Sequence, residues 1–487
     1  MNLTLDWVRE NVFQLLVGIG FAIGSVLLLG FKDLDQLNTV AIAFAVLVVI
    51  LLFIQNKRLL AIAVAFLVPF STPIWIGSAT MSVPAEPLLA LLSIGLFGWI
   101  TSQTRLDKRI FTHPLTILLL LDLGWMIIAS TFSSHVIYSY KRVAMRAVFL
   151  SGAYLMMIWF FKDPKAIIKF FYLYGIACVL VALNVLNKHA HYDFNHHYIA
   201  FATKPYFSDH TVYSACITVA FLFLLVISIR ARKIGFSKLA AFLIQAVTSV
   251  LFIAIMHASS RASWLSLIVV AGFAIAVKFK ISIRGILLSL GSIALIILVF
   301  QNDILEQMHN TDAKSRDKSM AVHFQSIGNI QTDNSNIERL NRWTCALRMF
   351  QERPLFGWGP GTYQYEYAQF QSRGELTWIS TFHGDKGNAH SEYLTYLSES
   401  GLIGLLIFLG WVFFSIHLGL KLVYNHPTLL GRTLALGLLL GLISFYVHGG
   451  VNAFIDQDKM AVLVFAALAG LVGLELNGRA IQDSNRV

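Results

Sequence analysis

The sequence predicts an all-α fold: a polytopic transmembrane helical bundle of about 12–14 spans with one large, partly helical loop outside the membrane. Two observations support this prediction. Hydrophobic residues make up 57% of the 487 residues and charged residues only 13%, and the mean hydropathy is strongly positive, unlike that of soluble domains. Apolar runs long enough to cross roughly 30 Å of hydrocarbon also recur along the chain, for example at 12–31, 40–54, 114–132 and 285–300.

The distribution of basic residues predicts how the bundle is oriented. The formal net charge is +11, but the basic residues form no single patch for nucleic acid. They concentrate on alternate loops, which the positive-inside rule assigns to the cytoplasm. Both termini are then expected in the cytoplasm and segment 301–390 outside. The basic loop residues are Lys57, Arg58, Arg105, Lys108, Arg109, Lys162, Lys165, Lys169, Arg230, Arg232, Lys233, Lys238, Lys278, Lys280, Arg284, Lys421 and Arg432.

The cysteine content and the N-terminal residues further restrict the class of membrane protein. Only Cys178, Cys216 and Cys345 occur, so no disulfide framework holds the outer region together. No Cys/His spacing typical of a metal site is present. Because acidic residues precede the first apolar run and no small-residue cleavage site follows it, we expect that run to be a retained anchor.

We expect four regions along the chain. Residues 1–210 and 211–300 hold transmembrane spans, the latter with Arg261; residues 301–390 form the large outer loop; residues 391–487 hold the last spans. Long connections usually carry function or disorder. The outer segments with room for function are 133–143, 187–210 and 301–390.

The aromatic half of the large loop predicts an ordered surface helix. Residues 335–338 (SNIE) have the spacing of a capping box, so a helix is expected to start there and to stop before Pro354. On this helix Arg339 neighbours Trp343, and Arg342 lies about one turn from Arg339. Its expected apolar face, lying along the membrane surface, consists of Ile337, Leu340, Trp343, Leu347 and Phe350.

Glycines mark two further features of this region. Residues 354–361 (PLFGWGPG) predict a rigid turn that lets backbone approach a partner closely. His390 leads into the next apolar run, where helical spacing predicts one stripe that ends in glycines and lets another helix approach. That stripe is His390, Leu394, Leu397, Gly401 and Gly404.

Arg261, Arg339 and His390 are the candidate catalytic residues. Each also has an ordinary interpretation: Arg261 can snorkel to lipid head groups, Arg339 can be an exposed charge on a surface helix, and a lone histidine is more often structural. Together, two fixed cations and one titratable base at the outer interface suit a phosphate-bearing lipid. Arginine binds phosphate bidentately, and histidine can accept a proton near neutral pH.

The remaining candidates are substrate-binding residues in the outer segments. The cations Lys141, Arg142 and Arg146 can instead anchor a helix end to lipid phosphates, and Asp209, followed by His210, can instead cap the next helix. For Glu399 we expect a structural role, as a buried carboxylate bonded to a neighbouring span. The complete substrate-binding set is Lys141, Arg142, Arg146, Asp209, His210, Arg342 and Trp343.

Three stretches resemble the bacterial O-antigen ligase superfamily, which includes polysaccharide polymerases and protein O-oligosaccharyltransferases. They are 338–343 (ERLNRW) with 354–361, 388–394 (NAHSEYL) with 399–404 (ESGLIG), and Ser260-Arg261. The family's helix arginine lies four residues before the tryptophan and matches Arg339, and its histidine matches His390. Related sequences have Asn or Asp where this chain has Ser391.

The resemblance implies glycosyl transfer at the periplasmic face of the bacterial inner membrane. The implied donor is an undecaprenyl-pyrophosphate-linked glycan, and the acceptor is a hydroxyl, for which lipid A–core is our first choice. Transfer is expected to invert the anomeric carbon and to need no metal or cofactor. Arg261 and Arg339 are expected to stabilise the pyrophosphate leaving group, and His390 to take the acceptor's proton.

Other activities remain open at this point. The shared motifs do not separate a ligase acting on lipid A–core from a polymerase of lipid-linked repeats or from a protein O-oligosaccharyltransferase. A flippase that binds the same lipid without chemistry is an alternative of a different class. Transporters tend to show internal repeats and broken helices near the midplane. We find no convincing repeat here, and the polar candidates gather at one face, which favours an enzyme.

Overall fold

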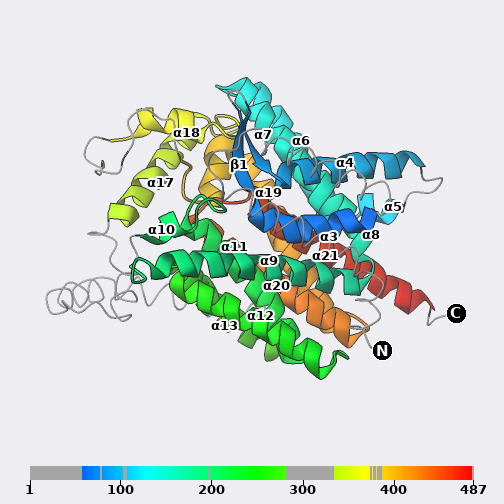
Figure 1. The fold of residues 1–487 in the computed structure, drawn as a ribbon. Helices are drawn as coiled ribbons and strands as arrows, with labels where there is room; N and C mark the ends of the chain where they lie inside the picture. Colours follow the sequence, from blue (N-terminus) through cyan, green and yellow to red (C-terminus); the bar gives the residue numbers. More distant parts are fainter. Residues whose placement is uncertain are drawn as a thin grey trace.

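The computed structural model describes residues 57–76, 79–102, 107–195, 198–280, 334–372, 376, 380 and 387–484. These residues form a helical bundle, which confirms the predicted all-α polytopic fold (Figure 1). Within them, nine helical segments are long and apolar enough to cross a membrane. The expected 12–14 spans include apolar runs in 1–56 and 281–333, which lie outside the described residues.

The candidate spans succeed one another with short connections. One of them, Val136–Phe161, is built from three consecutive helices, and its middle part is a π-helix. The spans are α6 (Pro114–Thr131), α7 (Val136–Val148) with η2 (Phe149–Leu155) and α8 (Met156–Phe161), α9 (Pro164–Ala190), α11 (His210–Arg230), α12 (Lys238–His257), α13 (Arg261–Lys278), α19 (Glu392–Asn425), α20 (Leu429–Val451) and α21 (Asp458–Ser484).

Shorter elements lie before the first span and between the later ones. They include a pair of antiparallel strands that the sequence analysis does not predict, paired from Thr72↔Val83 to Ile76↔Ala79. The shorter elements are α3 (Lys57–Leu67), η1 (Val68–Phe70), β1 (Thr72–Ile76), β2 (Ala79–Val83), α4 (Ala85–Ser102), α5 (Lys108–Phe111), α10 (Ile199–Ala202), α17 (Asn334–Glu352), α18 (Tyr363–Glu366) and η4 (Tyr367–Phe370).

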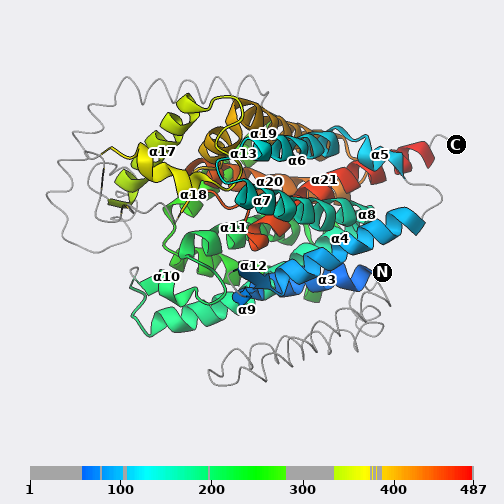
Figure 2. The same ribbon diagram turned by 90° about the horizontal axis from the view of Figure 1, so that it is seen from above.

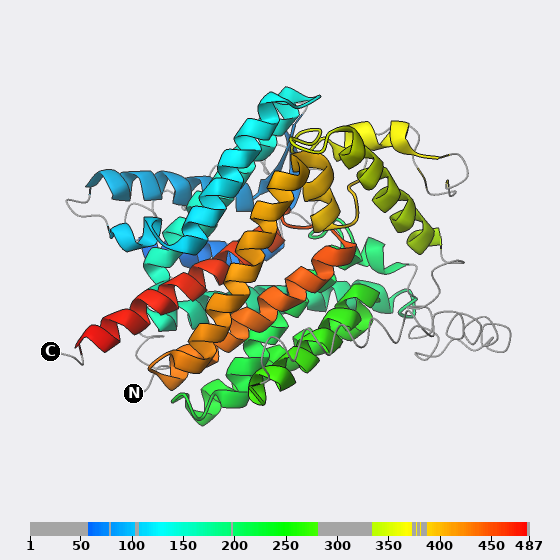
Figure 3. The same cartoon turned by 180° about the vertical axis from the view of Figure 1, so that it is seen from behind.

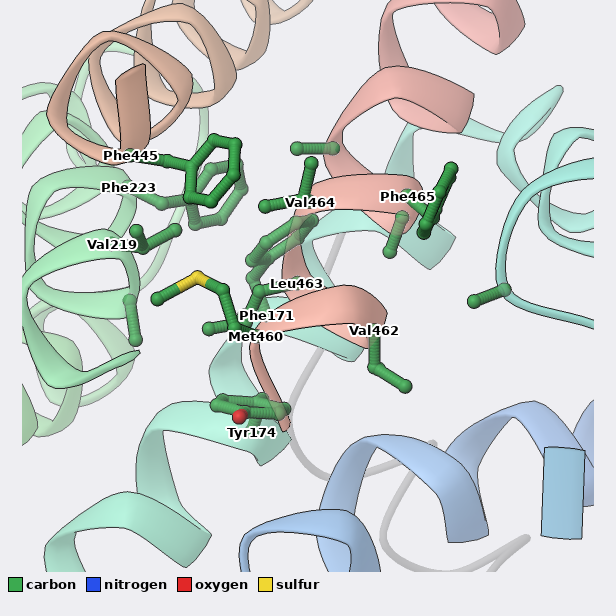
Figure 4. Packing of buried hydrophobic residues seen from close by; sticks show 14 of the residues in the cluster. Phe171, Tyr174, Val219, Phe223, Phe445, Met460, Val462, Leu463, Val464 and Phe465 are labelled. Atoms are coloured by element: carbon green, nitrogen blue, oxygen red, sulfur yellow. The ribbon is translucent and has the colours of Figure 1, made fainter. Parts of the chain in front are cut away.

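Helix α21 lies at the centre of the core. Nearly all of its apolar window is buried, as are most residues in those of α11 and α20. Figure 4 shows side chains from α9, α11, α20 and α21 packed together, among them Phe171, Phe223 and Met460. The rings of Phe171 and Phe223 are stacked with their centroids 4.5 Å apart. A continuous apolar interior of this kind holds the helices that surround it at fixed positions.

The two ends of the bundle differ in charge and in the number of additional helices that they carry. One end of the bundle holds helices α17 and α18 and the start of α19, next to the turn between α6 and α7 (Figures 2 and 3). We call this the site end. The opposite end, near the C-terminus, holds most of the basic connections. There Glu475 binds His113 at 2.9 Å and Lys421 at 2.8 Å. Basic residues thus alternate between connections as the sequence pattern predicts.

Close packing of α21 against α8 gives a stability prediction. A Cβ atom at Gly473 would lie 2.6 Å from the carbonyl oxygen of Phe161, whereas a Cβ at Gly272 on α13 meets nothing within 4 Å. We therefore expect Gly473→Ala to destabilise the protein by about 1–3 kcal/mol through overpacking. Gly272→Ala should be neutral or slightly stabilising. Thermal unfolding in detergent measures both, and equal melting temperatures for the two variants would contradict this packing.

Candidate functional site

Segments distant in sequence meet at the site end. The amide of Ser134, between α6 and α7, donates to the carbonyl of Trp358 at 3.1 Å. The side-chain amide of Asn388 donates to the carbonyl of Ala453 at 3.2 Å, before α21. These contacts join the first predicted outer segment, the large outer loop and the connection after α20. Figure 3 shows α17, α18 and the start of α19 together at this end.

The turn at residues 354–361 is attached to the bundle at a break in α19. Gly401 has φ 68° and ψ −172°, so the helical hydrogen bonds are interrupted around it. The amide of Trp358 donates to the carbonyl of Ser398 at 3.0 Å, and that of Gly359 to the carbonyl of Glu399 at 2.8 Å. Leu402 N–H donates to the carbonyl of Pro354 at 2.8 Å. Backbone groups released by the break are thus paired with the turn 354–361.

Glu399 completes this join with its side chain. Its carboxylate accepts the amide of Gly361 at 2.7 Å and the amide of Tyr363 at 2.9 Å. The carboxylate is therefore buried and structural, as expected, but its partners belong to the outer segment rather than to a neighbouring span. The turn needs its glycines, because a Cβ at Gly359 would lie 2.1 Å from the Ser133 hydroxyl oxygen.

The side of α17 that packs most closely against the protein is not its apolar stripe. The helix spans Asn334–Glu352 and stops before Pro354, as predicted. However, Leu340 and Leu347 of the predicted apolar face are 42% and 45% exposed, whereas Cys345 and Met349 are fully buried. These two leucines face outward, which is compatible with a helix on a membrane surface, whereas the other members of the stripe are partly buried. The opposite face fixes α17 on the protein.

Arg342 lies on the inward side of α17 and connects it to the loop before α19. Its Nε donates to the Glu338 carboxylate at 2.9 Å, and its Nη1 donates to the carbonyl of Asn388 at 3.2 Å. The guanidinium also stacks over the ring of Tyr367 at 4.9 Å from its centroid. Arg342 thus has a clear positional role, besides its predicted role as an additional cation.

His390 lies immediately before α19 and not within it. Ser391 is the N-cap of α19, and its Oγ accepts the amide of Leu394 at 3.4 Å. The backbone of His390 is left-handed, with φ 48°. The predicted continuous stripe from His390 to Gly404 is therefore wrong, because the histidine precedes the helix and the helix is broken at Gly401. Gly404 does allow close approach, by Trp125 of α6.

Hydrogen bonds from two sides hold the backbone of His390. Its amide donates to Oδ1 of Asn388 at 2.9 Å. Its carbonyl accepts the indole N–H of Trp343 at 3.3 Å. The predicted neighbours on α17, Arg339 and Trp343, are thereby brought beside the predicted base. Such support matters because a left-handed backbone is unfavourable for a residue other than glycine.

The charges around His390 determine its protonation. Burial, which is the largest cause, and the positive charges of Arg342 and Arg339 together lower the pKa of the imidazole to about 3, while the charge of Asp209 acts in the opposite sense. The side chain is therefore neutral near pH 7 and can accept a proton. The same interactions show that the segment ending at Asp209 reaches the site, because its charge is felt at His390.

The other predicted residues also lie at the site end, in different environments. Asp209 caps α11, because its Oδ1 accepts the amides of Thr211 at 2.6 Å and Val212 at 3.1 Å. This confirms the capping alternative. His210 is the first residue of α11, and Arg261 is the half-buried first residue of α13. Lys141 is exposed on α7.

Arg146 is already paired with internal carboxylates. Its Nη1 lies 3.0 Å from Asp122 and donates to Tyr396 at 2.7 Å, while its Nη2 lies 2.9 Å from Asp456. Arg142 binds the same Asp456 at 3.1 Å. Although burial raises the pKa of Asp456, the two arginines hold it below its usual value. This cluster ties α6, α7 and α19 to the connection before α21.

Sequence reasoning missed the acidic members of this cluster. Asp122 lies inside the apolar run 114–132, and an ionisable residue in such a run is itself a signal of a paired or functional group. Asp456 lies in the short connection before the last span, where spacing alone gives no partner. Among the residues that the structure describes, no three His, Cys, Asp or Glu side chains gather as a metal-binding group. The expected absence of a metal stays a prediction.

Comparison with known proteins agrees with this arrangement. Residues 246–409 match the family model described as O-antigen ligase. This part of the chain belongs to the O-antigen ligase superfamily. The match includes Arg261, Arg339 and His390, the three predicted catalytic residues. No curated protein sequence matches the chain.

The match to the O-antigen ligase model indicates a general activity. Together with the apolar helices, it supports a multi-pass membrane glycosyltransferase of the O-antigen ligase and polymerase family. Enzymes of this kind use a lipid-linked glycan donor and an acceptor in a membrane. The site end, where the match and the convergent polar residues coincide, is where we look for that chemistry.

The break in α19 leads to a second stability prediction. A Cβ at Gly401 would lie 2.1 Å from the carbonyl oxygen of Leu355, and the residue has a positive φ. Gly401→Ala should therefore detach the turn 354–361 and cost at least about 1–3 kcal/mol. Gly410→Ala on the same helix, whose nearest contact is 3.4 Å, is the matched control. Limited proteolysis should cut the 354–372 segment faster only in Gly401→Ala; equal cleavage of both variants would contradict the role of the break.

Proposed function

We propose that the protein is an O-antigen ligase that transfers a glycan from undecaprenyl pyrophosphate to a hydroxyl of lipid A–core. The reaction takes place at the periplasmic face of the bacterial inner membrane, with inversion at the anomeric carbon and without a metal. The observation that carries this proposal is the partly buried, neutral imidazole of His390, held beside α17 by Trp343 and close to the charges of Arg339 and Arg342. A base next to fixed cations suits attack on a sugar that bears a pyrophosphate leaving group.

In the proposed reaction, His390 accepts the proton of the acceptor hydroxyl as its oxygen attacks C1 of the donor sugar. The bond between C1 and the phosphate oxygen breaks, and undecaprenyl pyrophosphate leaves with the electron pair. Arg339 and Arg261 stabilise the negative charge that develops on the leaving phosphate. The imidazolium then releases its proton to solvent or to the departing phosphate, which restores the neutral base.

Arg339 and Arg342 also make the pKa of His390 depend on whether the donor is bound. Without donor, Arg342 and Arg339 help to keep the pKa of His390 near 3, which makes the imidazole a weak base. A bound pyrophosphate offsets these positive charges and raises that pKa towards the ordinary value for histidine. His390 therefore becomes an effective base when the leaving group is in place. This coupling disfavours proton abstraction in the absence of donor.

Direct transfer with purified components tests the proposal. We expect His390→Ala to lower kcat on the order of 10² to 10⁴-fold, the usual contribution of a general base. Arg339→Ala should lower it about 10² to 10³-fold, and Arg339→Lys less, because lysine keeps the charge but not the bidentate geometry. Arg232→Ala, at the opposite end of the bundle, is the control. The assay follows glycan transfer to lipid A–core in chelator.

Each outcome of this assay identifies an activity. Wild-type elongation of the donor glycan would show a polymerase, and glycosylation of protein hydroxyls would show a protein O-oligosaccharyltransferase. Movement of lipid-linked glycan across the bilayer without any transfer would show a flippase. Full activity of His390→Ala at equal protein levels would remove the proposed base.

The pH dependence of transfer provides a separate prediction. Because the pKa of free His390 is lowered, its base form is present above about pH 3 and is lost as the pH falls through that value. Bound donor raises this pKa, so the acid limb of kcat should lie at higher pH than that of kcat/KM. Rates from about pH 4 to 8 should therefore show an acid limb in kcat and none in kcat/KM. Coincident limbs would contradict the coupling between donor and base.

A further inference from the structure

The start of α13 lacks the side-chain cap that its N-cap residue could provide. Ser260 occupies this position, but its hydroxyl makes no capping hydrogen bond to the helix. The residue is only 2% exposed, and its Oγ has no hydrogen-bond partner within the part of the chain that the structure describes. A buried polar atom of this kind is costly unless a ligand or water completes its hydrogen bond.

A second buried polar side chain lies at the same level of the bundle. His448 of α20 is fully buried, and neither ring nitrogen has a hydrogen-bond partner among the described residues. The Ser444 hydroxyl, one turn earlier, donates to the hydroxyl of Ser266 on α13 at 3.1 Å. Because α13 and α20 are antiparallel, His448 comes level with Ala262, in the first turn of α13.

The electrostatics at the start of α13 favour an anion. The first amides of a helix have no intrahelical partner, and the helix dipole adds positive potential at that end. Arg261 contributes a full positive charge as the first residue of α13. The nearby carboxylate of Asp209 is directed to α11, whose amides at Thr211 and Val212 it accepts. Helix starts with such donors bind phosphate groups.

We propose that the start of α13, with the Ser260 hydroxyl and the His448 imidazole, is a phosphate subsite that holds the pyrophosphate of the lipid-linked donor. This assignment rests on the proposed function and adds two residues to it. Ser260 donates its hydroxyl hydrogen to a phosphate oxygen, and the imidazole of His448 donates a ring N–H. Both are binding residues and neither takes part in proton transfer from the acceptor.

Binding of farnesyl pyrophosphate to the purified full-length protein in nanodiscs tests the subsite. Ser260→Ala should weaken binding about 10-fold or more, as expected for a lost hydrogen bond to a charged group. Ser237→Ala, which removes the serine N-cap of α12 at the opposite end, should change it less than about twofold. Wild-type affinity in Ser260→Ala would overturn the proposal.

His448→Leu separates binding from folding. Replacing a buried imidazole without partners by an apolar side chain should leave the melting temperature of the unliganded protein unchanged or raise it. The same variant should bind farnesyl pyrophosphate about 10-fold more weakly. A lowered melting temperature with unchanged affinity would show that His448 is structural and would overturn its place in the subsite.

Competition experiments identify the source of the bound phosphate. Inorganic pyrophosphate should compete with farnesyl pyrophosphate, whereas phosphatidylglycerol in the nanodisc should not. Competition by phosphatidylglycerol that Ser260→Ala abolishes would assign the subsite to a phospholipid head group and overturn the donor assignment. Since binding needs no acceptor, Ser260-dependent binding without any transfer would overturn the ligase proposal alone. Normal transfer with Ser260-independent binding would overturn the subsite alone.

Discussion

The break in α19 at Gly401 is the feature on which the site depends. A helix interrupted at membrane depth exposes backbone groups that lipid cannot satisfy. In this protein the turn 354–361 satisfies them, with amides at Trp358 and Gly359 and a carbonyl at Pro354. Glu399 adds two hydrogen bonds from its side chain. The outer segment is thereby attached to a rigid span, and the arginines of α17 are held at a fixed position beside His390.

Because α17 is rigidly attached to the bundle, the charges around His390 are fixed in position. His390 precedes α19 directly, and Trp343 and Asn388 hold its backbone. The imidazole is therefore kept in a partly buried position with two arginines close enough to lower its pKa. Fixed charges of this kind need no reorganisation during a reaction, which is the condition under which they stabilise a transition state most effectively. A loose surface helix could not provide it.

The sequence predicted those features that follow from local pattern. Hydropathy gave the bundle, and the stop at Pro354 gave the end of α17. The spacing of Arg339 and Trp343 predicted that they are neighbours on α17, and the fold brings this part of the helix to His390. The alternation of basic loops matched the two ends of the bundle.

Features that depend on long-range pairing could not be predicted in this way. Helical spacing through Gly401 suggested a continuous stripe, because the partners that stabilise the break lie about 40 residues earlier in the chain. Periodicity identified an apolar face of α17 that lies along the membrane surface, but not that Cys345 and Met349 outside this face would be buried against the protein. Asp456 offered no signal, because its role comes from Arg142 and Arg146, which are more than 300 residues away.

The most direct test of this account is the protonation state of His390. Nitrogen-15 NMR of histidine-labelled protein in nanodiscs, with His390→Gln used to assign the signal, reports it with and without undecaprenyl pyrophosphate. The account predicts a neutral imidazole at pH 7 in the free protein and a pKa that rises when the pyrophosphate binds. A charged imidazole in the free protein, or a pKa that the pyrophosphate leaves unchanged, would contradict the proposed coupling between leaving group and base.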